Sequence, residues 1–147
     1  QYPRYLDIFK SCNLGSKQNI WCAKCSKCLF TYIMLAPFVA EEQLIAVFGK
    51  NLLNDEEMIQ FFDGLVCDQF DKPFECIGTR DEINTALTKT IDRYEAEQKE
   101  LPLLLQIYKH SYYDPYFDMS GVEHYFDPDN NVPAFLKEEL QWDSNKI

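Results

Sequence analysis

Four of the six cysteines lie close together near the start of the sequence, where they could bind one metal ion. They follow the spacing C-x9-C-x2-C-x2-C, as Cys12, Cys22, Cys25 and Cys28. A C-x2-C turn presents two sulfurs to the same ion, a third cysteine in the first helical turn completes that face, and a distant fourth closes the shell. Four thiolates in a tetrahedron favour zinc, and an iron–sulfur cluster is the competing interpretation.

Disulfides or unliganded core thiols are the other interpretations of this cysteine cluster. The polar neighbours Lys24, Ser26 and Lys27 argue against burial as simple apolar residues, and pairing two of three evenly spaced cysteines leaves one over. We therefore expect a zinc site, with the alternatives still open. A closed four-cysteine site has no free position for water or substrate, so its expected role is structural.

A second candidate for chemistry is the segment KPFECIG at 72–78, which interrupts the surrounding helical pattern. A thiolate at Cys76, beside Glu75, could transfer a proton, and the ammonium of Lys72 could lower its pKa. The alternative is that Cys76 is a small buried apolar residue. The sequence holds no glycine-rich phosphate loop, no G-x-S-x-G and no H-E-x-x-H.

The elements that must position these residues are predicted to be helices. Cys28 starts an apolar segment that ends at Pro37, and its apolar positions surround the whole helix, which is typical of a buried central helix. Helical spacing and cap residues predict further helices at 41–48, 55–65, 79–100, 103–112 and 133–140. The predicted fold class is mainly α: a helical domain with an N-terminal four-cysteine zinc knuckle.

The length of 147 residues fits one domain with its own core. We divide it into a knuckle with its lead-in (1–30), a helical body (31–112) and a loop-rich tail with many aromatic residues (113–147). The sequence starts at Gln1 and the cysteine cluster follows almost at once. It is therefore expected to be a piece of a larger protein that continues upstream of Gln1.

Charge and hydropathy exclude several classes of partner. The net charge is −10, and although residues 1–30 carry five basic residues against one acid, the remainder carries nine against 23. That balance argues against nucleic-acid binding over a broad face. The longest apolar run, 29–40, is too short to span a bilayer, so no membrane association is expected. Without a signal-peptide pattern, a thiolate cluster indicates the reducing cytoplasm.

The order of short motifs along the chain resembles two related groups of enzymes. The cysteine spacing is similar to that in the zinc-bearing C-terminal part of 7-cyano-7-deazaguanine synthases, which belong to the PP-loop ATP pyrophosphatase superfamily. A longer resemblance is to the C-terminal part of the UDP-N-acetylmuramoyl-L-alanyl-L-glutamate epimerases. It rests on five motifs in the same order: SCN, WCAKCSKCLF, LAPF, FGKNLL and KPFECIG.

The resemblance to the epimerases implies an enzyme of peptidoglycan precursor synthesis. Such an enzyme inverts the terminal L-glutamate of UDP-MurNAc-L-Ala-L-Glu, with ATP and magnesium as cofactors, and releases AMP and pyrophosphate. An acyl-adenylate lacks the negative charge of a carboxylate, so its α-proton is more acidic and a positioned base can remove it. By position in the shared motif, Cys76, Glu75 and Lys72 are the catalytic candidates, although Asp71 stands where a histidine is expected.

The sequence contains no PP-loop of the Ser-Gly-Gly type. The resemblance therefore implies an N-terminal PP-loop domain of the same protein as a partner that binds ATP, with this segment alone inactive. Two other functions stay open on the sequence: a different PP-loop enzyme that shares only the zinc site, and a zinc-stapled interaction module without chemistry. The shared motif at 72–78 counts against the first of these.

Overall fold

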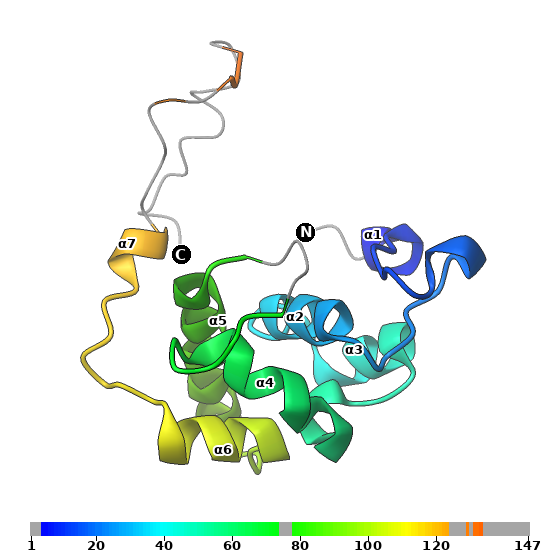
Figure 1. The fold of residues 1–147 in the computed structure, drawn as a ribbon. Coiled ribbons are helices and arrows are strands. Elements are labelled where there is room, and N and C mark those ends of the chain that lie inside the picture. Colours follow the sequence, from blue (N-terminus) through cyan, green and yellow to red (C-terminus); the bar gives the residue numbers. More distant parts are fainter. Residues whose placement is uncertain (1–3, 74–77, 124–128, 130, 134–147) are drawn as a thin grey trace. The chain divides into compact units, whose positions relative to one another are not determined.

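In the computed structural model, the described residues are 4–73, 78–123, 129 and 131–133, and every regular element among them is a helix (Figure 1). Seven are α-helices and three are short 3-10 helices. In chain order these are α1 (Arg4–Ile8), η1 (Ser16–Gln18), α2 (Ser26–Leu35), α3 (Glu41–Phe48), η2 (Leu52–Asn54), η3 (Glu56–Met58), α4 (Ile59–Val66), α5 (Arg80–Ala96), α6 (Leu103–Ser111) and α7 (Ser120–Glu123). The mainly α class predicted from the sequence is confirmed.

The chain divides into two compact units, Gln1–Asp114 and Pro115–Ile147. Helices α1 to α6 belong to the first unit and α7 to the second. The helix predicted at 133–140 falls almost entirely outside the described residues. None of the helices in the described ranges is long and apolar enough to cross a membrane.

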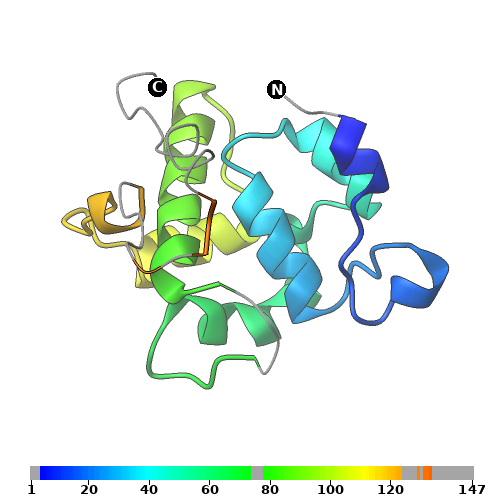
Figure 2. The same ribbon diagram turned by 90° about the horizontal axis from the view of Figure 1, so that it is seen from above.

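Helix α2 is the centre of the first unit, as its apolar sequence predicts. It contacts α3, α4, α5 and η2, and α3 and α5 lie on either side of it (Figures 1 and 2). Leu29 and Ile33 are fully buried, and the Tyr32 ring meets Phe48 of α3 edge-on at 5.2 Å between centroids. Because α2 carries the last cysteine of the cluster, the metal-binding segment joins directly to the core.

Helix ends follow local chemistry, and several of them differ from the prediction. The helix predicted at 55–65 divides into η3 and α4, which begins only at Ile59. Helix α5 starts with a capping box between Thr79 and Glu82. It ends at Ala96, four residues before the predicted end, because Gln98 takes a φ of +54° and the Lys99 N–H donates to the Tyr94 carbonyl. Helix α2 begins at Ser26 rather than at Cys28, so Cys28 lies within its first turn.

A hydrogen bond between Tyr94 and Glu41 ties α5 to the start of α3, and its removal should be measurable. The Tyr94 hydroxyl donates to Glu41 Oε2 at 2.6 Å, and burial together with this carboxylate raises the pKa of Tyr94. We expect Tyr94→Phe to lower the free energy of unfolding by about 1–3 kcal/mol, the range for a hydrogen bond to a charged group. The Tyr113 hydroxyl has no hydrogen-bond partner among the described residues, so Tyr113→Phe is the matched control in urea unfolding. Equal stability of the two variants would contradict the assignment.

Candidate metal centre

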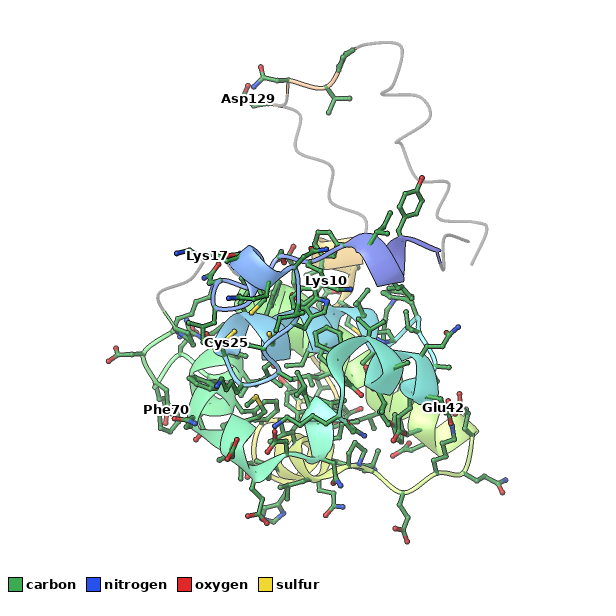
Figure 3. All side chains as sticks on the ribbon, turned by 90° about the vertical axis from the view of Figure 1, so that its right-hand side faces the viewer. Lys10, Lys17, Cys25, Glu42, Phe70 and Asp129 are labelled. Carbon is green, nitrogen blue, oxygen red and sulfur yellow. The ribbon has the colours of Figure 1, made fainter. Side chains whose placement is uncertain are left out.

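The structure brings all four predicted cysteines to one point. Their sulfurs lie within 4.8 Å of one another, and Figure 3 shows sulfur atoms beside the labelled Cys25. Two Sγ–Sγ distances are short: 3.6 Å from Cys22 to Cys28 and 3.5 Å from Cys25 to Cys28. A disulfide needs about 2.0 Å, and all four are free cysteines. For comparison, four sulfurs at 2.3 Å from one zinc ion are separated by about 3.8 Å.

The loop after Cys12 is built to hold its sulfur. The backbone N–H groups of Gly15 and Cys22 donate to Cys12 Sγ at 3.2 and 3.4 Å. The Ile20 N–H donates to the Gly15 carbonyl at 3.1 Å and closes the loop. A Cβ on residue 15 would lie 2.2 Å from the Ile20 carbonyl oxygen, so only glycine fits there.

The turn between Cys22 and Cys25 contains a strained residue. Ala23 has a φ of +53°, in the left-handed region that alanine rarely occupies, at a cost of about 1–2 kcal/mol. After this turn the chain enters α2. Cys25 stands immediately before the helix, and Cys28 lies in its first turn. Backbone strain of this kind is retained where the surrounding structure fixes the backbone conformation. Here the strained turn accompanies the convergence of the four cysteine sulfurs.

The surroundings separate the pKa values of the cysteine thiols. Burial raises the pKa of Cys12, but the N–H groups of Cys22 and Gly15 outweigh it and lower the value to about 7. Burial raises the pKa of Cys25 to about 11 and that of Cys28 further still. Without a metal, Cys25 and Cys28 therefore keep their protons at neutral pH, whereas Cys12 is partly ionised.

Metal binding at this site should depend steeply on pH. The ion binds thiolates, so the protons of Cys25 and Cys28 must leave, and affinity increases as the pH rises. Near pH 8, where Cys12 is already ionised, we expect the association constant for zinc to rise by at least about two decades per pH unit. Competition titration with a chromophoric chelator at pH 7, 7.5 and 8 measures this slope. An affinity that does not change with pH would show that these thiols are not the ligands.

The second predicted site lies only partly within the described residues. Glu75 and Cys76 fall outside them, whereas Lys72 is exposed and its ammonium donates to the Gly78 carbonyl. Arg80 also holds this region, with an ion pair to Asp68 at 2.8 Å and a hydrogen bond to the Phe70 carbonyl at 2.9 Å. The hydrogen bond between Lys72 and Gly78 thus joins the first and last residues of the motif.

The end of this motif rests on the helix that carries the metal centre. A Cβ on Gly78 would lie 3.2 Å from the ring of Phe30 in α2 and 2.4 Å from Glu82 Oε2 in the α5 capping box. Phe30 follows Cys28 by two residues. Gly78, the last residue of the motif, therefore lies beside the same helix that carries Cys28. Sequence reasoning did not identify this contact, although Phe30 and Gly78 both belong to the motifs.

Substitution of Gly78 should disturb the start of α5. In Gly78→Ala the new methyl group displaces the Glu82 carboxylate, which accepts from the Thr79 N–H at 2.6 Å. We expect the free energy of unfolding to fall by about 1–2 kcal/mol, the usual range for loss of an N-cap. The control is Gly121→Ala, because a Cβ there meets no atom within 4 Å. Thermal unfolding of both variants is the measurement, and a Gly78→Ala protein as stable as the control would refute the contact.

Comparison with known proteins places these residues within one family. The family model described as "MurL C-terminal domain" matches residues 8–112, a range that includes the cysteine cluster and the 72–78 motif. A UDP-N-acetyl-alpha-D-muramoyl-L-alanyl-L-glutamate epimerase from Xanthomonas oryzae pv. oryzae is 40% identical over 103 residues, which are 66% of this chain and 22% of the relative. One of the same name from a Micromonospora species is 38% identical over 92 residues, 60% of this chain and 21% of the relative.

These curated relatives are much longer than the matched region. The chain spans about a fifth of the length of each. None of the solved structures matches the chain.

Proposed function

Because the chain belongs to the MurL C-terminal domain family, we propose that it is the C-terminal domain of a cytoplasmic glutamate epimerase. The proposed reaction converts the terminal L-glutamate of UDP-MurNAc-L-Ala-L-Glu to D-glutamate in peptidoglycan precursor synthesis. One observation carries this proposal: the family match from residue 8 to 112 includes both the cysteine cluster and the 72–78 motif. The two relatives described above are named for the same epimerisation.

We propose that the four cysteines bind one structural zinc ion. Support comes from Sγ–Sγ distances of 3.5 and 3.6 Å, which suit ligands around a single ion. In a [4Fe–4S] cluster each cysteine binds a different iron atom, and in a [2Fe–2S] cluster the four divide into one pair on each iron. Four sulfurs within 4.8 Å of one another therefore suit a single ion better. Bound zinc would fix the start of α2, where Phe30 lies beside Gly78, the last residue of the 72–78 motif. In this account the metal takes no direct part in catalysis.

The proposed chemistry needs ATP and magnesium, which we assign to an N-terminal PP-loop domain of the full-length enzyme. Attack of the glutamate carboxylate on the α-phosphorus of ATP forms an acyl-adenylate and releases pyrophosphate. Loss of the carboxylate charge acidifies the α-carbon, so that a base can remove its proton. Return of a proton to the opposite face inverts the centre, and hydrolysis of the adenylate releases AMP.

We assign the base to the 72–78 motif, with Cys76 as the first candidate and Glu75 as the second. The base removes the α-proton from one face as a thiolate or carboxylate, and the proton that is added to the opposite face comes from a second acid or from water. The contact from the Lys72 ammonium to the Gly78 carbonyl supports a positioning role for Lys72. In this account Lys72 joins the two ends of the motif and helps to hold Gly78 beside α2.

The direct test is the stereochemistry of the product. The full-length protein is incubated with UDP-MurNAc-L-Ala-L-Glu, ATP and magnesium, and the glutamate is released by acid hydrolysis and separated on a chiral column. We expect D-glutamate to appear together with AMP, and none to form when ATP is omitted. Glutamate that stays entirely in the L form would remove the epimerase assignment and leave a zinc-stapled module without this activity.

A further inference from the structure

Large apolar side chains are unusually exposed in the first twenty residues. Nine large hydrophobic residues are exposed within the described part of the chain, and five of them lie between positions 5 and 20. We call these five the N-terminal face: Tyr5 (48% exposed), Ile8 (66%), Phe9 (55%), Leu14 (64%) and Ile20 (51%). Single exposed apolar residues are ordinary, but a concentration of them marks an interaction site.

The N-terminal face adjoins an apolar groove between α1 and the core. The groove has a volume of about 210 Å³ and is lined by Tyr5, Leu6, Phe9, Trp21, Leu35 and Val47. The Phe9 ring lies 6.0 Å from that of Trp21, which itself packs on Phe48 at 4.8 Å. Phe9 therefore lines the groove on one side and remains more than half exposed. An apolar segment from elsewhere would find a preformed site here.

The metal-binding loop fixes the other half of the face. Leu14 and Ile20 flank η1, and the hydrogen bond from the Ile20 N–H to the Gly15 carbonyl closes the loop between them. The Gly15 N–H donates to Cys12 Sγ, so the cysteine cluster itself supports this loop. Figures 1 and 2 show α1 and the loop on the same side of the first unit, and Figure 3 looks onto that side. Both halves of the face are thus available to one partner.

Basic side chains accompany the apolar ones. Residues 1–30 carry five basic residues against one acid, whereas the chain as a whole has a net charge of −10. Lys17 and Lys24 are exposed in the metal-binding segment, and Lys27 donates to Asn13 Oδ1 at 3.3 Å. A partner that fits this side is therefore apolar at its centre and acidic at its rim.

The relatives indicate where such a partner comes from. This domain corresponds to about a fifth of their length, and the family is one of C-terminal domains. Most of a full-length relative therefore precedes this domain and joins it on the side of α1. A surface tethered so closely to the preceding chain meets it at a high effective concentration.

We propose that the N-terminal face and its groove form the docking surface for the preceding domain of the same polypeptide. This rests on the domain organisation in the proposed function, but not on the epimerisation chemistry. The cysteine cluster then has a second role besides supporting α2, because it holds Leu14 and Ile20 in the interface. Interfaces between domains of one chain typically bury 600–1,500 Å².

Photo-crosslinking in the full-length protein tests the proposal. Phe9 is replaced by p-benzoylphenylalanine, the protein is irradiated, and the linked peptides are identified by mass spectrometry. His110 is the control position, because it is exposed on α6, which lies at the opposite end of the first unit from α1 in Figure 1, and it is not part of the 72–78 motif. We expect the probe at Phe9 to link to peptides of the preceding domain, and the probe at His110 to give at least tenfold less of these products.

A second probe at Leu14 makes the result independent of any local disturbance at Phe9. Links from Phe9 and Leu14 to the preceding domain would support the proposal. Links only within residues 1–147, links to a second copy of the chain, or no links from either position would overturn it. The measurement needs no substrate or turnover, so an inactive protein that still gives the expected links would refute the epimerase assignment and leave the docking surface standing.

Discussion

Cys25→Ser is expected to remove the bound metal and to destabilise the domain by more than about 5 kcal/mol, because structural zinc contributes about 10–16 kcal/mol in small zinc domains. Three thiolates would remain, and the serine hydroxyl does not ionise to replace the fourth. Cys25 is buried immediately before α2, and its sulfur lies 3.5 Å from that of Cys28. With the site disrupted, the start of the central helix loses its attachment to the loop from Cys12.

Cys67→Ser is the matched control for this experiment. Cys67 is a free, partly buried cysteine that follows α4 and lies outside the cluster. It should keep one metal ion per chain and lose little stability. Metal content by mass spectrometry and urea unfolding measure both variants. A Cys25→Ser protein that is metal-free and as stable as the control would refute the structural role of the centre.

Cys76→Ala in the full-length enzyme is expected to lower kcat for epimerisation by about 10²–10⁴-fold, the usual contribution of a positioned acid–base group. The thermal midpoint should change little if Cys76 acts only through its thiol. The control is Cys67→Ala, a cysteine outside the 72–78 motif. Formation of the adenylate, followed as pyrophosphate release, separates the two steps.

In the proposed mechanism, Cys76→Ala should still release pyrophosphate while D-glutamate no longer forms. Unchanged epimerisation would remove Cys76 from the mechanism and leave Glu75 as the remaining candidate. Loss of both steps together with lower stability would mean that the residue supports the fold rather than the proton transfer.

Cysteine spacing and cap chemistry made much of the first unit predictable. The short separations between Cys22, Cys25 and Cys28 restrict where their sulfurs can lie, and these three converge together with the sulfur of Cys12, as the spacing of all four predicts for one metal ion. Gly49 ends α3 with a φ of +85°, and Thr79 caps α5, as their residue types predict. These features depend on contacts within a few residues, which a single sequence contains.

Features that depend on distant contacts could not be predicted. The contact between Gly78 and Phe30 joins positions far apart in the chain, and no local pattern encodes it. The exposure of Ile8 and Phe9 also could not be predicted, because apolar residues near a chain start are expected to dock on the core. The early end of α5 depends on the left-handed Gln98, a conformation that its residue type does not favour.

The most direct test of the central claim is the metal content of the purified protein, measured anaerobically by mass spectrometry with an absorption spectrum of the same sample. The four-cysteine geometry predicts one zinc ion per chain and no absorption in the visible range. A brown sample that contains iron and sulfide would contradict the zinc assignment, and the epimerase proposal would then have to be rebuilt around an iron–sulfur protein.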